Sequence, residues 1–277
     1  MPALSKRMKH VLMLVSPHAA VADVGCDHGY MAIELIRSGK AEHVIAMDIN
    51  EGPLARASAN VAAYGLNNVI GMRLSDGMEA LGIGEVQGVI CAGMGGKTIC
   101  GILERSHELV QKLEELVLQP QSELHIVRSY LRENGLLIAA EDMISEDGKF
   151  YPMMRAVPAR SAGADAEKAD STTVKEACGA KGQMLCGAAD GAFYRMEAEA
   201  ADKPEADTQR QRVEDRYGPR LLAMAHPVLR QYLQKERAVC EEVLRSLSQT
   251  DTERGRSRRE ELLRQLSDLA YAEGFFV

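Results

Sequence analysis

Short β-branched runs alternate with amphipathic segments of helical period over the first 158 residues. The apolar runs predict seven strands, at Val21–Gly25, His43–Asp48, Val69–Leu74, Gly88–Ala92, Glu115–Gln119, Gly135–Glu141 and Tyr151–Val157. The segments between them predict helices at Tyr30–Ser38, Gly52–Tyr64, Lys97–Lys112 and Ser122–Asn134, after an amphipathic opening stretch at Met8–Val15. Such alternation is typical of a doubly wound parallel sheet with helices on both faces, whose last strand here returns as a hairpin after the turn Glu146–Lys149.

The pattern changes twice after this region, which divides the chain into three parts. Residues 1–158 form the predicted α/β domain, and residues 159–207 are poor in aliphatic side chains, which predicts a low-complexity, partly disordered insertion. Apolar residues then keep a helical period from Leu221 to Leu247 and again from Leu262 to Ala270. We expect these two stretches to form an antiparallel helical hairpin with coiled-coil-like packing, within a helical domain of residues 208–277.

Bulk properties narrow the classes of function. The net charge of -7 and the pI near 5.6 argue against a general nucleic-acid binder, although local basic patches remain open because residues 209–277 are richer in Lys and Arg. The six cysteines lack the spacing of a metal site or a disulfide framework, so we expect no metal and reduced thiols. Without a membrane-spanning run or a signal peptide, a cytoplasmic protein is expected, and the oligomeric state stays open, a monomer included.

The stretch Val21–Tyr30 carries the strongest chemical signal, because a buried strand ends there in an acidic, glycine-punctuated turn that opens a helix. Gly25 permits a sharp turn, and the helix N-terminus offers free N–H groups to a nucleotide cofactor. Asp27 stands where a dinucleotide-binding loop has its second glycine, so this position repels phosphate and disfavours an NAD enzyme. It suits a positively charged ligand such as the amino group of S-adenosylmethionine, although an ordinary βα turn without a ligand remains an alternative.

Polar or glycine-rich turns follow the other predicted strands as well. Asp48 fits an acid that binds ribose hydroxyls or one that caps the next helix, and Asp76 before Gly77 fits a contact to an adenine amino group or a plain turn. The run Ala92–Gly96 lets backbone approach a ligand closely. Gln119 offers an amide to a base edge or to the cap of the next helix.

Together these features resemble the TrmK family, the tRNA adenine-N1 methyltransferases that modify adenine 22. The resemblance rests on Ala22–Tyr30, Ala46–Asn50, Ser75–Gly77, Ala92–Gly96, Leu118–Pro120 and Tyr217–Leu222, and it covers nearly the whole chain except the insertion. It implies a class I Rossmann-like methyltransferase domain that uses S-adenosylmethionine, followed by a helical appendage that helps to hold tRNA. The expected reaction is transfer of a methyl group to N1 of an adenine in tRNA.

The resemblance also implies roles for individual residues. Asp27 and the backbone near Gly25 would hold the methionine part of the cofactor, Asp48 its ribose and Asp76 its adenine. The remaining residues expected to line the cofactor site are Asp23, His28, Ile49, Gly77, Ala92 and Gly93. Tyr30 would stack on a flipped-out adenine, or simply pack on the sheet, and Met94 would line the methyl-transfer channel with Gly93. His28 is expected to organise the loop by hydrogen bonding.

Substrate contacts are expected from Gln119 and from basic residues at the two ends of the chain. Arg7, Arg256 and Arg259 are candidates for phosphate contacts, although arginines on helices often form only a solvated face. Other readings of the same sequence are a methyltransferase for a small molecule or a protein, and an RNA-binding module without catalysis. If tRNA is the substrate, these arginines should share a side of the molecule with Tyr30 and Met94.

Overall fold

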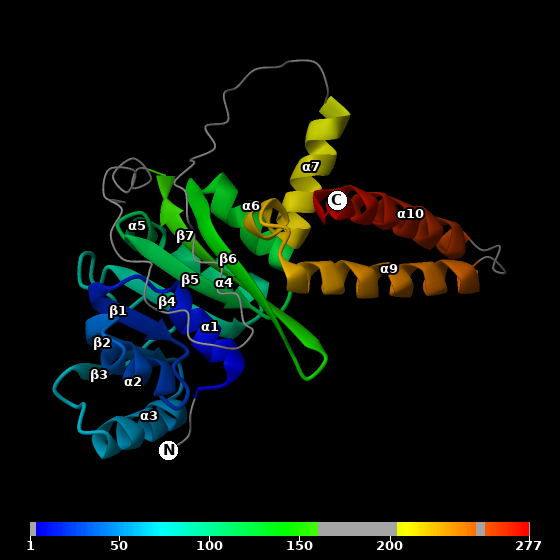
Figure 1. Cartoon of the computed structure of the whole chain (residues 1–277). Helices are drawn as coiled ribbons and strands as arrows, with labels where there is room; N and C mark the ends of the chain where they lie inside the picture. The colour runs from blue at the N-terminus through cyan, green and yellow to red at the C-terminus, as the bar shows by residue number, and fades with distance from the viewer. Residues whose placement is uncertain (1–3, 160–203, 248–252, 277) are drawn as a thin grey trace, which may run out of the picture.

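A seven-stranded sheet forms the centre of the computed structural model, which describes residues 4–159, 204–247 and 253–276 (Figure 1). The strands lie in the order β3-β2-β1-β4-β5-β7-β6. Their bounds are β1 His18–Val24, β2 Ala41–Asp48, β3 Ile70–Leu74, β4 Gly88–Met94, β5 Glu115–Pro120, β6 Leu136–Glu146 and β7 Lys149–Pro158. Strand β7 runs antiparallel to both of its neighbours, and the other pairs are parallel. The predicted sheet and its terminal hairpin are therefore confirmed.

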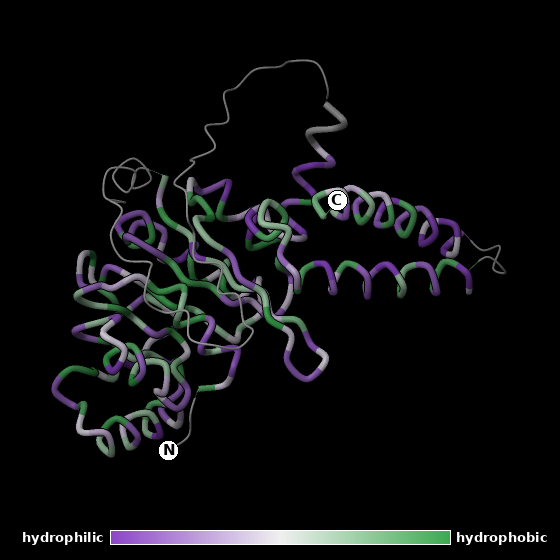
Figure 2. Tube along the Cα trace, viewed as in Figure 1, coloured by the Kyte–Doolittle hydropathy of each residue, from purple (hydrophilic) through white to green (hydrophobic). Residues whose placement is uncertain are grey.

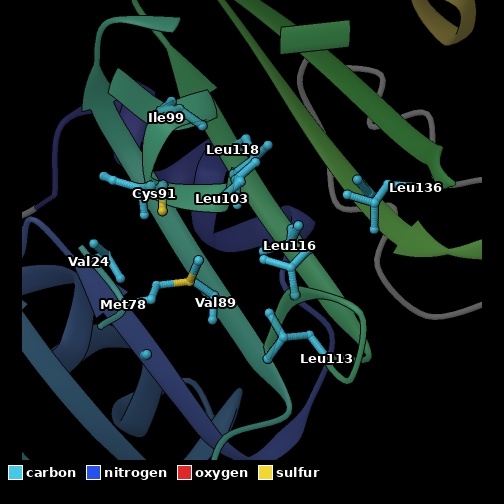
Figure 3. Packing of buried hydrophobic residues seen from close by; sticks show 14 of the residues in the cluster. Val24, Met78, Val89, Cys91, Ile99, Leu103, Leu113, Leu116, Leu118 and Leu136 are labelled. Carbon is cyan, nitrogen blue, oxygen red and sulfur yellow. The ribbon is translucent and has the colours of Figure 1, made fainter. Parts of the chain in front are cut away.

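Six helices cover the two faces of this sheet. Helices α1 (Lys6–Leu14), α2 (Tyr30–Arg37) and α3 (Glu51–Ala63) pack into one apolar cluster, and α4 (Gly96–Arg105), α5 (His107–Val110) and α6 (Leu124–Glu133) pack into another. Successive strand residues such as Val21 and Ala22 belong to opposite clusters, as the period of two requires. Hydrophobic residues concentrate along the strands in Figure 2, and Figure 3 shows part of the second cluster, which includes Ile99, Leu103, Cys91 and Leu118.

In the described part of the chain beyond residue 203, four helices follow the α/β domain. They are α7 (Pro204–Tyr217), α8 (Pro219–Ala223), α9 (Pro227–Leu247) and α10 (Glu253–Glu273), and a short 3-10 turn, η3 (Gly274–Phe276), follows α10. Helices α9 and α10 lie side by side as an antiparallel hairpin that extends away from the sheet (Figure 1). Leu229, Leu233 and Cys240 of α9 are buried in the same cluster as Leu262 and Leu269 of α10. The helical hairpin is confirmed, while coiled-coil packing stays a prediction.

Strand β1 begins at His18 and not at Val21, strand β6 runs on to Glu146 and not to Glu141, and three helical regions differ more strongly from the predicted ones. The predicted helix Lys97–Lys112 is interrupted at Ser106, whose backbone leaves helical geometry. The period from Leu221 to Leu247 crosses a break between α8 and α9, because Ala225 has a φ of 47° and Pro227 disfavours a helical conformation for the residue before it. Helix α7 begins at Pro204, within the predicted insertion, and the rest of that insertion, residues 160–203, lies outside the described residues.

A buried ion pair fastens the C-terminal helices to the sheet. Arg128 on α6 donates from Nε to Oε1 of Glu141 on β6 over 2.9 Å, and both side chains are at most 2% exposed. Arg128 Nη1 also donates to the backbone carbonyls of Asp215 and Arg216, while Glu141 Oε2 accepts the N–H of Arg220. These contacts fix the turn between α7 and α8 against the sheet.

Candidate functional site

The strand order places a candidate site at the carboxyl edge of the sheet. Strand β1 lies between β2 and β4, which continue the chain in opposite directions across the sheet. In open α/β sheets the crevice at such a reversal receives ligands. The turns predicted to carry chemistry follow β1, β2, β3, β4 and β5 at this same edge.

The turn after β1 brings two predicted motifs into contact. Gly25 has a φ of 78°, and the N–H groups of Gly25 and Cys26 both donate to the carbonyl of Met47 at 2.8 and 2.9 Å. A Cβ atom added at Gly25 would lie 2.3 Å from Cε of Met94, so the Met94 side chain lies directly against this turn. Glycine adopts the positive φ at position 25 without strain, and the close contact is with the flexible end of the Met94 side chain.

The acidic residue of the loop is exposed and faces a cation. Asp27 has a φ of 45°, and its carboxylate lies 3.1 Å from Nη2 of Arg56 on α3. Helix α2 starts immediately afterwards, and its N-cap residue Gly29 has no side chain to cap the first N–H groups, while the buried Asp23 carboxylate accepts the N–H of Ala32. The ring of His28 stacks on that of Tyr30 with centroids 5.8 Å apart. The loop therefore presents a carboxylate, two rings and a helix N-terminus together.

Asp23, beneath the loop, is 4% exposed, and its Oδ2 atom has no hydrogen-bond partner within the described chain. Burial raises the pKa of this carboxyl to about 7, opposed by the backbone N–H of Ala32 and reinforced by repulsion from Asp48. Burial also raises the pKa of the Cys26 thiol to about 12 and that of Cys91 to about 12. Neither thiol is a thiolate near neutral pH, so the site offers no cysteine nucleophile.

The turns after β2 and β3 carry the other predicted cofactor contacts. Asp48 Oδ1 accepts the N–H of Asn50 over 2.9 Å, and the neighbouring Ile49 is 59% exposed. Asp76 Oδ1 accepts a hydrogen bond from Nη2 of Arg105 over 2.9 Å. Gly77 has a φ of 60° and abuts the Ile102 side chain. Asp48 thus has a local turn bond, and Asp76 has an exposed ion pair.

The glycine-rich turn after β4 is open at one residue and crowded at another. Gly93 has a φ of 82°, and the sheet register shifts between Ala92 and Met94, so the strand ends in an irregular turn. A Cβ atom at Gly96 would lie 2.6 Å from the carbonyl oxygen of Ser122, whereas the nearest atoms to one at Gly93 are 3.7 Å away or more. Gly96 therefore packs α4 against the turn before α6, and Gly93 leaves space above the sheet.

The predicted substrate contacts divide into two places. Arg7, at the start of α1, donates from Nη1 to Oε1 of Gln119 over 3.0 Å, close to Gly93. Gln119 is fully buried. Arg256 and Arg259 lie in the first turns of α10, at the end of the hairpin farthest from the sheet (Figure 1). The structure thus brings Arg7 to the candidate site, and it does not bring the two arginines of α10 there.

Sequence reasoning missed the cations that face the predicted aspartates. Arg56 pairs with Asp27 and Arg105 pairs with Asp76, over separations of 29 residues each. No motif marks such partners, because the pairings depend on which helices flank which strands. The described residues contain no group of three or more His, Cys, Asp or Glu side chains arranged to hold a metal. None of their helices is both long and apolar enough to cross a membrane.

A separate cavity of about 760 Å³ lies between α6 and the C-terminal helices. Tyr130, Arg212 and Tyr232 contribute to its lining, and none of the predicted site residues does so. The chemistry predicted from sequence therefore gathers at the sheet edge and not in this cavity.

Comparisons with known sequences concern mainly the α/β domain. Residues 4–154 match the family model described as a methyltransferase domain. The tRNA (adenine(22)-N(1))-methyltransferase of Bacillus subtilis is 35% identical over 151 residues, which is 54% of this chain and 63% of that protein. That match spans less than two thirds of the relative's length.

Two solved structures resemble the chain along almost its full length. The crystal structure of the B. subtilis tRNA methyltransferase TrmK superposes with a TM-score of 0.73 at 26% identity and covers 98% of each chain. Streptococcus pneumoniae Sp1610 in complex with S-adenosyl-L-methionine gives a TM-score of 0.70 at 28% identity and covers 98% of this chain and 99% of that one. Since the family model spans more than half of its residues, the chain belongs to the methyltransferase-domain family.

Proposed function

We propose that this protein transfers a methyl group from S-adenosylmethionine to N1 of adenine 22 in tRNA. The observation that carries the proposal is the likeness, over α/β domain and helical hairpin alike, to B. subtilis TrmK and to the S. pneumoniae protein in complex with S-adenosyl-L-methionine. The turns at the carboxyl edge support it, because they supply the residue types that such a cofactor needs. We place the activity in the cytoplasm, with tRNA as partner.

The loop after β1 fits the methionine part of the cofactor. Gly25 gives the turn its left-handed backbone conformation, and the first N–H groups of α2 suit the cofactor's carboxylate. Asp27 suits the amino group. Its present partner, Arg56, is a half-exposed cation in a solvent-screened pair, so exchanging that pair for a ligand costs little.

The neighbouring turns fit the nucleoside part of the cofactor. Asp48 retains Oδ2 for ribose hydroxyls while Oδ1 holds the turn, and Ile49 offers an exposed apolar surface. Asp76 and Gly77 lie at the end of β3, where the adenine would reach, and Asp76 has Arg105 as a competing partner. Ala92 and Gly93 complete the wall at the end of β4.

The chemistry needs placement more than proton transfer. S-adenosylmethionine supplies an electrophilic methyl group, and N1 of adenine has a lone pair at neutral pH, so no residue has to remove a proton beforehand. In this proposal Tyr30 stacks on the flipped adenine, and Met94 beside Gly25 lines the channel between the two reactants. The absence of a thiolate at Cys26 agrees with direct transfer without a covalent enzyme intermediate.

Incubation with methyl-labelled S-adenosylmethionine and unmodified tRNA, followed by digestion to nucleosides, tests the proposal. We expect the label in 1-methyladenosine. Label in a different nucleoside, or transfer only to a protein or a small molecule, would contradict it and favour the other methyltransferase readings. Binding of tRNA without any transfer would favour a non-catalytic module.

Calorimetry with S-adenosylmethionine tests the cofactor assignment separately. We expect Asp27→Ala and Asp48→Ala each to weaken binding by roughly 10-fold, as the loss of a charge-assisted hydrogen bond would. Glu34→Ala is a matched control, because Glu34 is an α2 carboxylate that pairs with Arg37 in an exposed pair. If both aspartate variants bind like the control, the assignment is wrong.

A further inference from the structure

One arginine of the α/β domain differs from the others in its partners. Residues 4–159 contain eight arginines, and seven of them lie within 4 Å of a carboxylate oxygen. The exception is Arg7, for which no ion pair with a described acidic side chain is found. Its full positive charge is therefore left for a ligand.

Neutral groups hold the Arg7 side chain in a fixed position. Its Nη1 atom donates to Oε1 of Gln119, and Nε2 of Gln119 donates to the carbonyl of Pro120 over 3.2 Å, which fixes the orientation of the amide. Gln119 is fully buried, so its amide is not exposed to a base edge. The guanidinium carbon also lies 5.4 Å from the centre of the Tyr151 ring, at cation–π distance.

The place of Arg7 separates it from the turns after β1 and β2, which are expected to hold the methionine and the ribose of the cofactor. Its anchors are on β5 and β7, whereas Asp27 and Asp48 follow β1 and β2. Strand β5 is two strands from β1 and β7 is three, about 10 to 15 Å across the sheet. Arg7 nevertheless stands beside Gly93, since Nη1 lies 3.8 Å from where a Cβ atom would be there.

We propose that Arg7 binds a backbone phosphate of the nucleotide that carries the target adenine, and that Gln119 is a positioning residue that aims Arg7. This inference rests on the proposed function. A preorganised guanidinium without a carboxylate partner matches the geometry and charge of a phosphodiester. The neutrality of Gln119 is essential to the arrangement, because a carboxylate at the same place would neutralise the cation.

Binding of tRNA across a range of salt concentrations tests the role of Arg7. Arg7→Ala should weaken tRNA binding by roughly 10-fold and reduce the slope of log K against log salt by about 0.7 to 0.9, the amount expected for one phosphate contact. Arg7→Lys, which keeps the charge, should largely retain the slope. Arg37→Ala is the control, since Arg37 is half-exposed and pairs with Glu34 at the C-terminal end of α2.

Calorimetry with S-adenosylmethionine distinguishes phosphate from the other anion nearby, the carboxylate of the cofactor. The proposal predicts that Arg7→Ala leaves cofactor affinity unchanged within about 2-fold, the scatter expected for a residue outside the site. A large loss of cofactor affinity, or an unchanged salt slope, would overturn it. Failure of the wild-type protein to bind tRNA would overturn it as well, whereas tRNA binding with a normal slope but no methyl transfer contradicts only the proposed function.

Substitutions at Gln119 test positioning through Arg7. Gln119→Met removes the acceptor at similar volume, and Gln119→Glu places a carboxylate against the guanidinium. Both should lower tRNA affinity in the wild-type background and have no further effect in the Arg7→Ala background, which a merely structural role would not produce. Additive effects in the double variants, with melting temperatures matched, would overturn the assignment.

Discussion

Two arginines one turn apart on α6 permit a quantitative test of how the C-terminal helices are fastened. Arg128 is 2% exposed and pairs with buried Glu141, whereas Arg132 is 40% exposed and pairs with Asp215. We expect Arg128→Met to lower the free energy of unfolding by about 3 to 5 kcal/mol, because it leaves Glu141 charged, buried and uncompensated. It also leaves the carbonyls of Asp215 and Arg216 without their donor.

Arg132→Met is the matched control, and it should cost at most about 1 kcal/mol, since exposed pairs contribute little. Urea denaturation followed by circular dichroism, with hydrogen exchange of the α7 and α8 amides, would measure both. Adding Glu141→Met to Arg128→Met should recover only part of the loss, because the N–H of Arg220 then has no acceptor. Equal losses in the two single variants would refute the reasoning that burial sets the value of the Arg128 pair.

Two further predictions concern the end of β1 and the loop that follows it. Gly25→Ala should lower cofactor affinity by roughly 10-fold in calorimetry, because its Cβ atom would displace Met94. Gly39→Ala is the control, because it carries the same backbone strain of about 1 to 2 kcal/mol at a φ of 69°, while its Cβ atom would have no other atom within 4 Å. Equal cofactor affinities of the two variants would contradict the prediction. The pKa of Asp23 is about 7 in the folded protein against an ordinary 3.8. Between these two pH values the folded protein keeps a proton on Asp23 that the unfolded chain has released. Stability should therefore fall by up to about 4 kcal/mol as pH rises from 4 to 7, and Asp23→Asn should remove this decline in thermal melts, so a variant with an unchanged pH profile would contradict the assignment.

The sheet and the placement of the motifs could be predicted because they depend on local pattern. Buried parallel strands read as apolar runs, and the residue types at their ends follow from the turns they make. Periodicity misled where it runs through a break, as at Ser106 and between α8 and α9. Helix α7 was missed over its first turn because its buried apolar residues are confined to Val213 and Tyr217 near its end, which gives no helical period.

The partners of the site residues could not be predicted from one sequence. Arg7 and Gln119 are 112 residues apart and meet only because α1 packs against β5 and β7. Gln119 was expected to contact a base edge or to cap the next helix, and burial of its whole side chain instead favours a role behind Arg7. Likewise, the raised pKa of Asp23 reflects burial and the nearness of Asp48, neither of which a strand pattern encodes.

Methylation of two tRNA transcripts tests the central claim most directly. The first transcript carries adenine at position 22, and the second differs only by guanine at that position. With methyl-labelled S-adenosylmethionine, the account predicts label in 1-methyladenosine from the first transcript and none from the second. Equal labelling of both transcripts, or label in any other nucleoside of the first, would contradict it.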